Sequence, residues 1–374
     1  MTQASSATPD GTARYRQRFL DRVAPEHFRL AQGLWLSSIG LGTYLGHWDD
    51  ATDLSYQAAI HRAFERGCNV IDTAINYRFQ RSERAIGRAL EEAFRQGIVS
   101  RDEIIIATKG GYIPFDTEPP QTPHEWSRYI IETFIRPGII APTELVGRGS
   151  HCLAPRYLEN QLETSLKNLR LATIDIYYLH NPEEQLNEVS RDEFRRRIRA
   201  AFEMLESKVA EGKIRLYGTA TWNGYRVPED APDHLSLSEL VALAREVGGP
   251  DHHFRVIQAP YNLAMVEALT VPTQTVNGHS VSLLEAALHL GMTVMASASL
   301  LQSRLARGLP ESLRSAFPGL RSDAQRALQF VRSTPGITTA LVGMSRVEHV
   351  EENLLVARVP PSSVEDFRSV PGSS

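Results

Sequence analysis

The sequence predicts an α/β protein, a (β/α)8 TIM barrel with a long insertion after the third strand. Three observations lead to this fold. Eight short apolar runs have strand character, amphipathic segments of helical period separate them, and glycines stand where a helix ends before a strand. Parallel neighbouring strands need a crossover, usually a helix, and eight strand-helix units close naturally into a barrel.

The predicted strands are short, apolar and bounded by turn residues. They cover residues 39–44, 69–74, 103–109, 174–180, 214–220, 255–260, 293–297 and 338–343. The predicted helices show apolar residues at helical spacing. They cover residues 54–66, 82–94, 155–169, 194–210, 237–247, 283–290, 323–331 and 347–356. Gly67, Gly212 and Gly291 each follow a helical pattern, where a left-handed residue ends a helix.

The predicted organisation is one barrel domain over residues 31–360. Residues 1–30 form an N-terminal extension that we expect to be partly disordered, with a polar tail up to Tyr15, and residues 361–374 form a C-terminal tail. The proline-rich stretch 111–154 far exceeds an ordinary connection of about 4 to 6 residues. We expect this insertion to contain a short helix around 125–135 and to shape the substrate mouth, because loops after barrel strands lie on the catalytic face.

Composition narrows the class of protein. Hydrophobic residues make up 42% of the 374 residues and charged residues 22%, which is typical of a soluble globular chain. The formal net charge of −4 gives no electrostatic reason to expect a nucleic-acid partner. The two cysteines are too few for a disulfide framework, and the N-terminus lacks an apolar signal region. We therefore expect a cytoplasmic protein that does not enter a membrane; the oligomeric state stays open.

Four polar residues stand where predicted strands end. Asp72 and Tyr77 lie at and just after the end of the second strand, Lys109 ends the third, and His180 ends the fourth. Singly, each could be a turn former or a solvated charge. Together, at three successive strand ends of a barrel, they indicate a catalytic site.

Such a set suits the reduction of a carbonyl group. A hydride reaches the carbon while a phenol, here Tyr77, gives a proton to the developing alkoxide. A free phenol has a pKa of about 10, and a neighbouring ammonium favours the phenolate. Asp72 would hold Lys109 charged and in place, and His180 would orient the carbonyl or share the proton relay.

These segments resemble the aldo-keto reductase superfamily, and the match extends along most of the chain. The matching segments are Gly40-Leu41-Gly42-Thr43, Asp72-Thr73-Ala74 with Tyr77, Thr108-Lys109-Gly110, Leu179-His180-Asn181-Pro182, Gly212-Lys213-Ile214-Arg215, Gln258-Ala259-Pro260-Tyr261-Asn262, and Val342-Gly343-Met344-Ser345-Arg346 followed by Glu351-Glu352-Asn353. The combination is specific, although no single segment is.

The resemblance implies the family's fold, its catalytic set on Asp72, Tyr77, Lys109 and His180, and a nicotinamide cofactor, NADP(H) preferred and NAD(H) possible. It also implies a set of cofactor contacts. Gln258 and Thr221 would meet the carboxamide, Ser299 and Leu300 the pyrophosphate, Ser345 and Arg346 the 2'-phosphate, and Glu352 and Asn353 the adenine, with Thr43 at the first strand end. A guanidinium at a helix start is suited to a phosphate.

Two segments depart from the family pattern. Gly218-Thr219-Ala220-Thr221-Trp222 lacks the serine and asparagine that usually grip the carboxamide. Residues 296–301 lack the usual aromatic residue, and His349 stands where NADP-preferring relatives often carry arginine.

The sequence therefore predicts an NADP(H)-preferring reductase that acts on a small carbonyl or alcohol substrate. A non-catalytic nicotinamide-binding regulatory or sensor subunit on the same barrel is the first alternative, because the carboxamide contacts are altered. A metal-dependent hydrolase is the second, but it needs histidines on several strands. We assign no metal, because no second ligand pair lies at suitable spacing from His151-Cys152, and we expect Asp251-His252-His253, just before a strand, to form a solvated turn.

Overall fold

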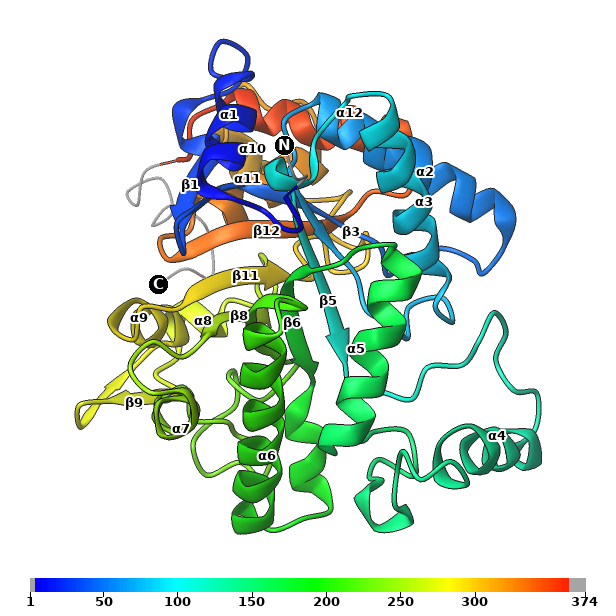
Figure 1. Ribbon diagram of the computed structural model, residues 1–374. Helices are drawn as coiled ribbons and strands as arrows, with labels where there is room; N and C mark the ends of the chain where they lie inside the picture. The colour runs from blue at the N-terminus through cyan, green and yellow to red at the C-terminus, as the bar shows by residue number, and fades with distance from the viewer. Residues whose placement is uncertain (1–3, 363–374) are drawn as a thin grey trace.

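The computed structural model describes residues 4–362, which form a closed barrel of parallel strands in the order β11-β12-β3-β4-β5-β6-β7-β8 (Figure 1). The predicted fold class is confirmed, and each predicted barrel strand is present. Their bounds are β3 Ile39–Gly42, β4 Val70–Asp72, β5 Ile105–Gly110, β6 Ile174–His180, β7 Ile214–Ala220, β8 Phe254–Pro260, β11 Thr293–Ser297 and β12 Ile337–Gly343.

Helices surround the barrel at the predicted places. They are α2 Asp50–Glu65, α3 Arg81–Arg95, α5 Pro155–Leu169, α6 Arg191–Ala210, α7 Leu237–Gly248, α9 Leu283–His289, α11 Asp323–Ser333 and α12 Val347–Leu354. Local sequence explains their starts. The Ser282 hydroxyl accepts the Glu285 N–H and the Glu285 carboxylate accepts the Ser282 N–H, which satisfies two free donors at the start of α9.

Several short helices and strands lie outside the barrel sheet. They are α8 Glu267–Thr270, α10 Glu311–Ala316, the hairpin of β9 Gln274–Val276 and β10 His279–Val281, and short 3-10 helices including η2 Arg101–Glu103 and η5 Pro182–Asn187.

The barrel interior is a packed core built by alternation along the strands. Side chains of alternate residues point inward, so Val70, Ile105, Ile176 and Val256 form one apolar cluster. Further along several strands, the side chains that point inward are polar. These polar groups therefore stand at the carboxyl ends of the strands. The sequence period thus separates an apolar core from a polar mouth.

The opposite end of the barrel is covered by the N-terminal segment. The antiparallel hairpin of β1 Phe28–Ala31 and β2 Leu34–Ser37 inserts Leu34 and Leu36 into the interior cluster. Ala7 joins the same cluster and is fully buried. The segment that precedes the barrel therefore completes its core.

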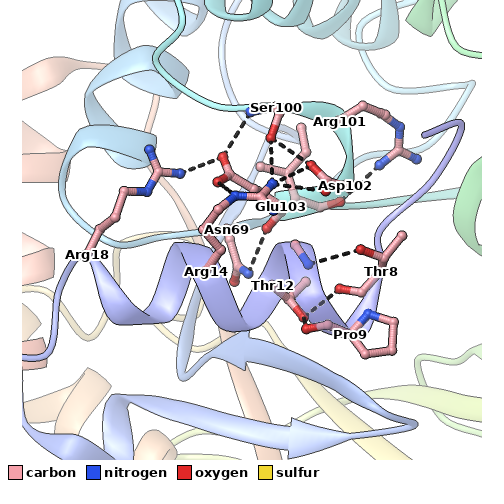
Figure 2. Close-up of polar contacts among 12 residues, drawn as sticks. Thr8, Pro9, Thr12, Arg14, Arg18, Asn69, Ser100, Arg101, Asp102 and Glu103 are labelled. Carbon is pink, nitrogen blue, oxygen red and sulfur yellow. Dashed lines mark hydrogen bonds and ion pairs between the residues drawn. The ribbon is translucent and has the colours of Figure 1, made fainter. Parts of the chain in front are cut away.

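Helix α1 (Pro9–Gln17) replaces most of the disorder expected up to Tyr15. The Thr8 hydroxyl caps it by accepting the Gly11 N–H at 2.9 Å. Figure 2 shows Arg14 and Arg18 of this segment reaching the carboxylates of η2, with Arg14 2.8 Å from Asp102. These contacts span more than 80 residues of sequence, so the local composition could not reveal them.

The insertion at residues 111–154 has a small core of its own. It contains α4 Pro123–Ile130 and a wider turn of helix at Ile131–Ile135, in agreement with the short helix expected there. Phe115, Ile130 and Phe134 are buried within it. In Figure 1, α4 lies at the lower right, apart from the barrel strands.

The domain boundaries remain predictions, and the C-terminal tail expected at 361–374 lies outside the described residues from position 363 onward. Within residues 4–362, no helix combines the length and apolar character needed to cross a bilayer.

Candidate functional site

A cavity of about 570 Å³ opens at the carboxyl ends of the barrel strands, a volume within the usual range for small-molecule sites. Residues of all eight barrel strands, or of the loops after them, line it. They include Thr43, Tyr44, Asp72, Asn76, Tyr77, Tyr112, His180, Asn181, Glu184, Thr221, Trp222, Gln258, Ser299 and Leu300.

The strand period brings the polar groups together. Asp72 stands two residues after the core residue Val70, and Gln258 two residues after Val256. Lys109 is paired across the sheet with Tyr178, two residues before His180. Because each strand repeats every two residues, all four point into the barrel mouth.

A buried ion pair lies beneath the cavity. Lys109 Nζ donates to Asp72 Oδ1 at 2.6 Å and to the Thr73 carbonyl at 2.8 Å. Gln258 Nε2 donates to Asp72 Oδ2 at 2.8 Å, so both carboxylate oxygens are satisfied. Burial disfavours the charged amine, but Asp72 and Tyr77 more than offset this and raise the pKa of Lys109. The amine therefore stays protonated.

Tyr77 packs against this pair. The Lys109 amine lies 5.0 Å from the centroid of its ring. Burial raises the pKa of Tyr77, while the charge of Lys109 opposes the rise, and the net direction is upward. At neutral pH the phenol therefore keeps its proton, with a cation beside it that would stabilise the phenolate.

His180 lies beside Tyr77, with ring centroids 5.9 Å apart. Burial, together with the positive charge of Lys109, lowers the pKa of His180 well below its usual value. The imidazole is therefore neutral at physiological pH. Its Nδ1 atom is buried and has no hydrogen-bond partner among the described residues.

Glu183 fixes the loop that follows β7. Its Oε1 atom accepts the backbone N–H groups of Trp222, Asn223 and Gly224 at 2.7, 3.0 and 3.3 Å. Burial raises the pKa of Glu183 to about 7. The carboxylate thereby positions Trp222 and the two residues after it, directly beyond Thr221 in the segment that departs from the family pattern.

The residues expected to contact a cofactor fall into two groups. Thr43, Thr221, Gln258, Ser299 and Leu300 line the cavity. The other four are Ser345, Arg346, Glu352 and Asn353, on the β12–α12 connection and on α12. Within residues 4–362, none of them lines the cavity. Arg346 and Glu352 are exposed, Ser345 is half-buried and Asn353 is buried.

The cavity suits a polar ligand. The hydroxyl of Thr221 and the side-chain oxygen of Asn76 are buried there without a hydrogen-bond partner in the described part of the chain. Such atoms are costly unless a ligand or water meets them. One N–H of the Gln258 amide donates to Asp72, which leaves its second N–H and its oxygen for the expected carboxamide contact. These residues fit a nicotinamide group.

Sequence reasoning did not single out Tyr44, Asn76, Tyr112, Asn181 or Glu184, which also line the cavity. Each lies within a few residues of a strand end, which is the one signal that could have found them. Of the insertion at 111–154, Tyr112 alone among the described residues reaches the cavity lining. The insertion contributes this ring and, through His151, a bond to the His180 carbonyl at 2.8 Å.

Comparison with known proteins identifies the family that the sequence resembles. Residues 38–308 match the model of the aldo/keto reductase family. The aldo-keto reductase YhdN of Bacillus subtilis is 27% identical over 197 residues, which cover 51% of this chain and 45% of YhdN. A putative voltage-gated potassium channel subunit beta of Schizosaccharomyces pombe is 22% identical, covering 90% of this chain and 89% of that protein.

Solved structures share the fold. An aldo/keto reductase from Klebsiella pneumoniae in complex with NADP and acetate has 21% sequence identity and a TM-score of 0.60, covering 93% of this chain and 94% of that one. The holo form of an aldo-keto reductase from Bacillus halodurans has 20% identity and a TM-score of 0.62, covering 93% and 96%.

Proposed function

The chain belongs to the aldo/keto reductase family, and from this premise we propose that it is an NADP(H)-preferring reductase of aldehydes or ketones with Tyr77 as proton donor. The observation that supports this most is the arrangement around one cavity of Tyr77, the buried Asp72–Lys109 pair and His180.

The proposed chemistry divides between cofactor and protein. A bound nicotinamide supplies the hydride for the carbonyl carbon. The protonated phenol of Tyr77 donates its proton to the carbonyl oxygen, and the positive charge of Lys109 stabilises the phenolate that remains. Asp72 keeps the lysine charged and in place. Neutral His180 orients the carbonyl oxygen, since an imidazolium beside Lys109 would be unfavourable.

The proposed cofactor contacts follow the two groups of residues. The Thr221 hydroxyl and the Gln258 oxygen would hold the carboxamide, with Thr43 beside them, and Ser299 and Leu300 the pyrophosphate. Ser345 and Arg346 would hold the 2'-phosphate, and Glu352 and Asn353 the adenine. Arg346 NH2 lies 2.7 Å from His349 Nε2, so an exposed cation is present where the phosphate is expected.

The cofactor preference has its own test. Arg346→Ala should weaken NADPH binding about 10-fold and NADH binding much less, because a guanidinium-phosphate contact is worth about 1.5–3 kcal/mol. Fluorescence titration of both cofactors measures this. Equal losses for both would place the phosphate elsewhere.

A second candidate is a nicotinamide-binding regulatory or sensor subunit without turnover. The likeness to a putative channel beta subunit over 90% of the chain favours it. Single-turnover mixing of NADPH-loaded protein with a panel of aldehydes and ketones separates the two functions. Oxidation of the cofactor in the wild type, and its loss by about 10³-fold in Tyr77→Phe with NADPH affinity retained, supports the reductase. No oxidation with any carbonyl, with the cofactor bound, supports the sensor.

A further inference from the structure

A wall of three rings leads away from the proposed proton donor. The Tyr77 and His180 rings lie 5.9 Å apart, and the His180 and Tyr112 rings 4.9 Å apart, each pair nearly perpendicular. The Tyr112 hydroxyl accepts from Asn181 Nδ2 at 3.0 Å and donates to Glu184 Oε1 at 3.2 Å. A substrate held at Tyr77 and extending along this wall therefore reaches the Glu184 carboxylate.

The charged residues that line the cavity are acidic. Its lining contains no lysine or arginine within residues 4–362. The negative charge of Asp72 is matched by Lys109, and His180 is neutral. Glu184 is half-buried and forms no ion pair with the described residues; besides Tyr112, its Oε2 accepts from Asn187 Nδ2 at 3.5 Å. Glu184 is thus the uncompensated charge of the cavity.

Aromatic rings surround the same opening. Tyr44 is 56% exposed and Trp222 44% exposed, and both line the cavity with Tyr112. The faces of such rings attract cations. A half-buried carboxylate adds an attraction that is less screened by water than at an open surface. Carboxylate and rings therefore favour the same kind of ligand.

We propose that Glu184, with the rings of Tyr44, Tyr112 and Trp222, selects carbonyl substrates that carry a cationic substituent and rejects those that carry a carboxylate. This inference rests on the proposed reductase function. The hydrogen bond from Tyr112 holds the carboxylate toward the cavity, and Asn181 in turn orients Tyr112.

The test uses three benzaldehydes that differ in their para substituent: trimethylammoniomethyl, hydroxymethyl and carboxylate. In the wild type, kcat/KM should be highest for the cation and lowest for the carboxylate, with a spread of about 10-fold or more. In Glu184→Gln the ratio of cation to hydroxymethyl should fall about 10-fold. Using the ratio removes any general loss of activity from the comparison.

Glu203→Gln is the matched control, since Glu203 is exposed on α6 and absent from the cavity lining. It should leave the ratio unchanged. An unchanged ratio in Glu184→Gln, or a wild-type preference for the hydroxymethyl compound over the cation, would overturn the inference; the latter result would make Glu184 an acceptor for hydroxyl groups.

A binding measurement keeps the outcome separate from turnover. Benzyltrimethylammonium should bind NADP-loaded wild-type protein in calorimetry, and Glu184→Gln should weaken it about 10-fold. If the protein binds the cation but reduces none of the three aldehydes, the result counts against the reductase function and supports the cation site. Reduction without any charge preference, and with no binding of the cation, would remove the cation site and leave the reductase.

Discussion

Two buried ion pairs occupy opposite ends of the same barrel. At the carboxyl end, Lys109 and Asp72 are 2.6 Å apart; toward the amino end, Arg101 and Asp175 are 2.7 Å apart. Both pairs are nearly inaccessible to solvent. Asp72 of the first pair lines the cavity at the carboxyl end, whereas neither Arg101 nor Asp175 does. Their chemistry is alike, so what lies beside each pair decides what it can do.

In the second pair, the protein itself bonds both carboxylate oxygens of Asp175. Asp175 Oδ1 accepts the Ala7 N–H at 2.7 Å, and Oδ2 accepts from Arg101 and from the Ile106 N–H. Arg101 also donates to the Thr173 carbonyl at 2.8 Å. Such a pair holds the docked N-terminal segment through Ala7 and leaves no carboxylate oxygen of Asp175 free for a substrate. We therefore expect activity to depend on the first pair and stability on the second.

Removing the amine at the carboxyl end should have the largest effect. Lys109→Met takes away the cation that stabilises the Tyr77 phenolate, and kcat for carbonyl reduction should fall on the order of 10³-fold. Single-turnover kinetics with NADPH-loaded protein measures the loss. If the variant is folded and retains most of the wild-type rate, the first pair is not catalytic.

Breaking the second pair should affect stability instead. Asp175→Asn leaves Arg101 as a buried, unpaired charge, which costs about 3 kcal/mol of the free energy of unfolding. Urea denaturation measures it, with Asp192→Asn, an exposed change at the start of α6, as the control. At temperatures where the variant is folded, kcat should match the wild type; a loss like that of Lys109→Met would contradict the division between the two ends.

Glu183 differs from Asp72 and Asp175, because among the described residues it has no cationic partner and accepts backbone N–H groups. Burial raises its pKa from 4.5 to about 7, so the folded protein binds this proton more tightly than the unfolded chain. Its contribution to stability is present below pH 4.5 and is lost as the pH rises from 4.5 to 7.

Glu183→Gln keeps an oxygen acceptor and removes this titration. Between pH 5 and pH 8, the stability of the variant relative to the wild type should therefore rise by about 2 kcal/mol. Denaturation at the two pH values measures the change. A difference that does not depend on pH would show that Glu183 is ionised in the folded state without penalty.

Much of the fold could be predicted from the sequence. The bounds of β6, β7 and β11 agree with the predicted runs to the residue, because a buried parallel strand leaves an apolar run with sharp ends. The positions of Asp72, Lys109 and His180 at strand ends also followed from this pattern. Their roles remain proposals, but their meeting at one cavity is a structural fact.

Other features could not be read from local patterns. Helix α1 is polar in composition, and its arginines meet carboxylates of η2 far along the chain. We expected the insertion to shape the cavity broadly, but among the described residues only Tyr112 of the insertion lines it. Most of the insertion packs on itself. The link from Tyr112 to Glu184 joins two loops from different strands.

By itself, the sequence determined where strands begin and end and which polar residues stand at their ends, because hydrophobic period and turn residues act over a few positions. It did not show what lies beside Asp72 and Asp175, two aspartates at opposite ends of apolar strands. Tertiary structure decided that one faces a cavity and the other a docked chain segment, because those neighbours come from distant parts of the sequence.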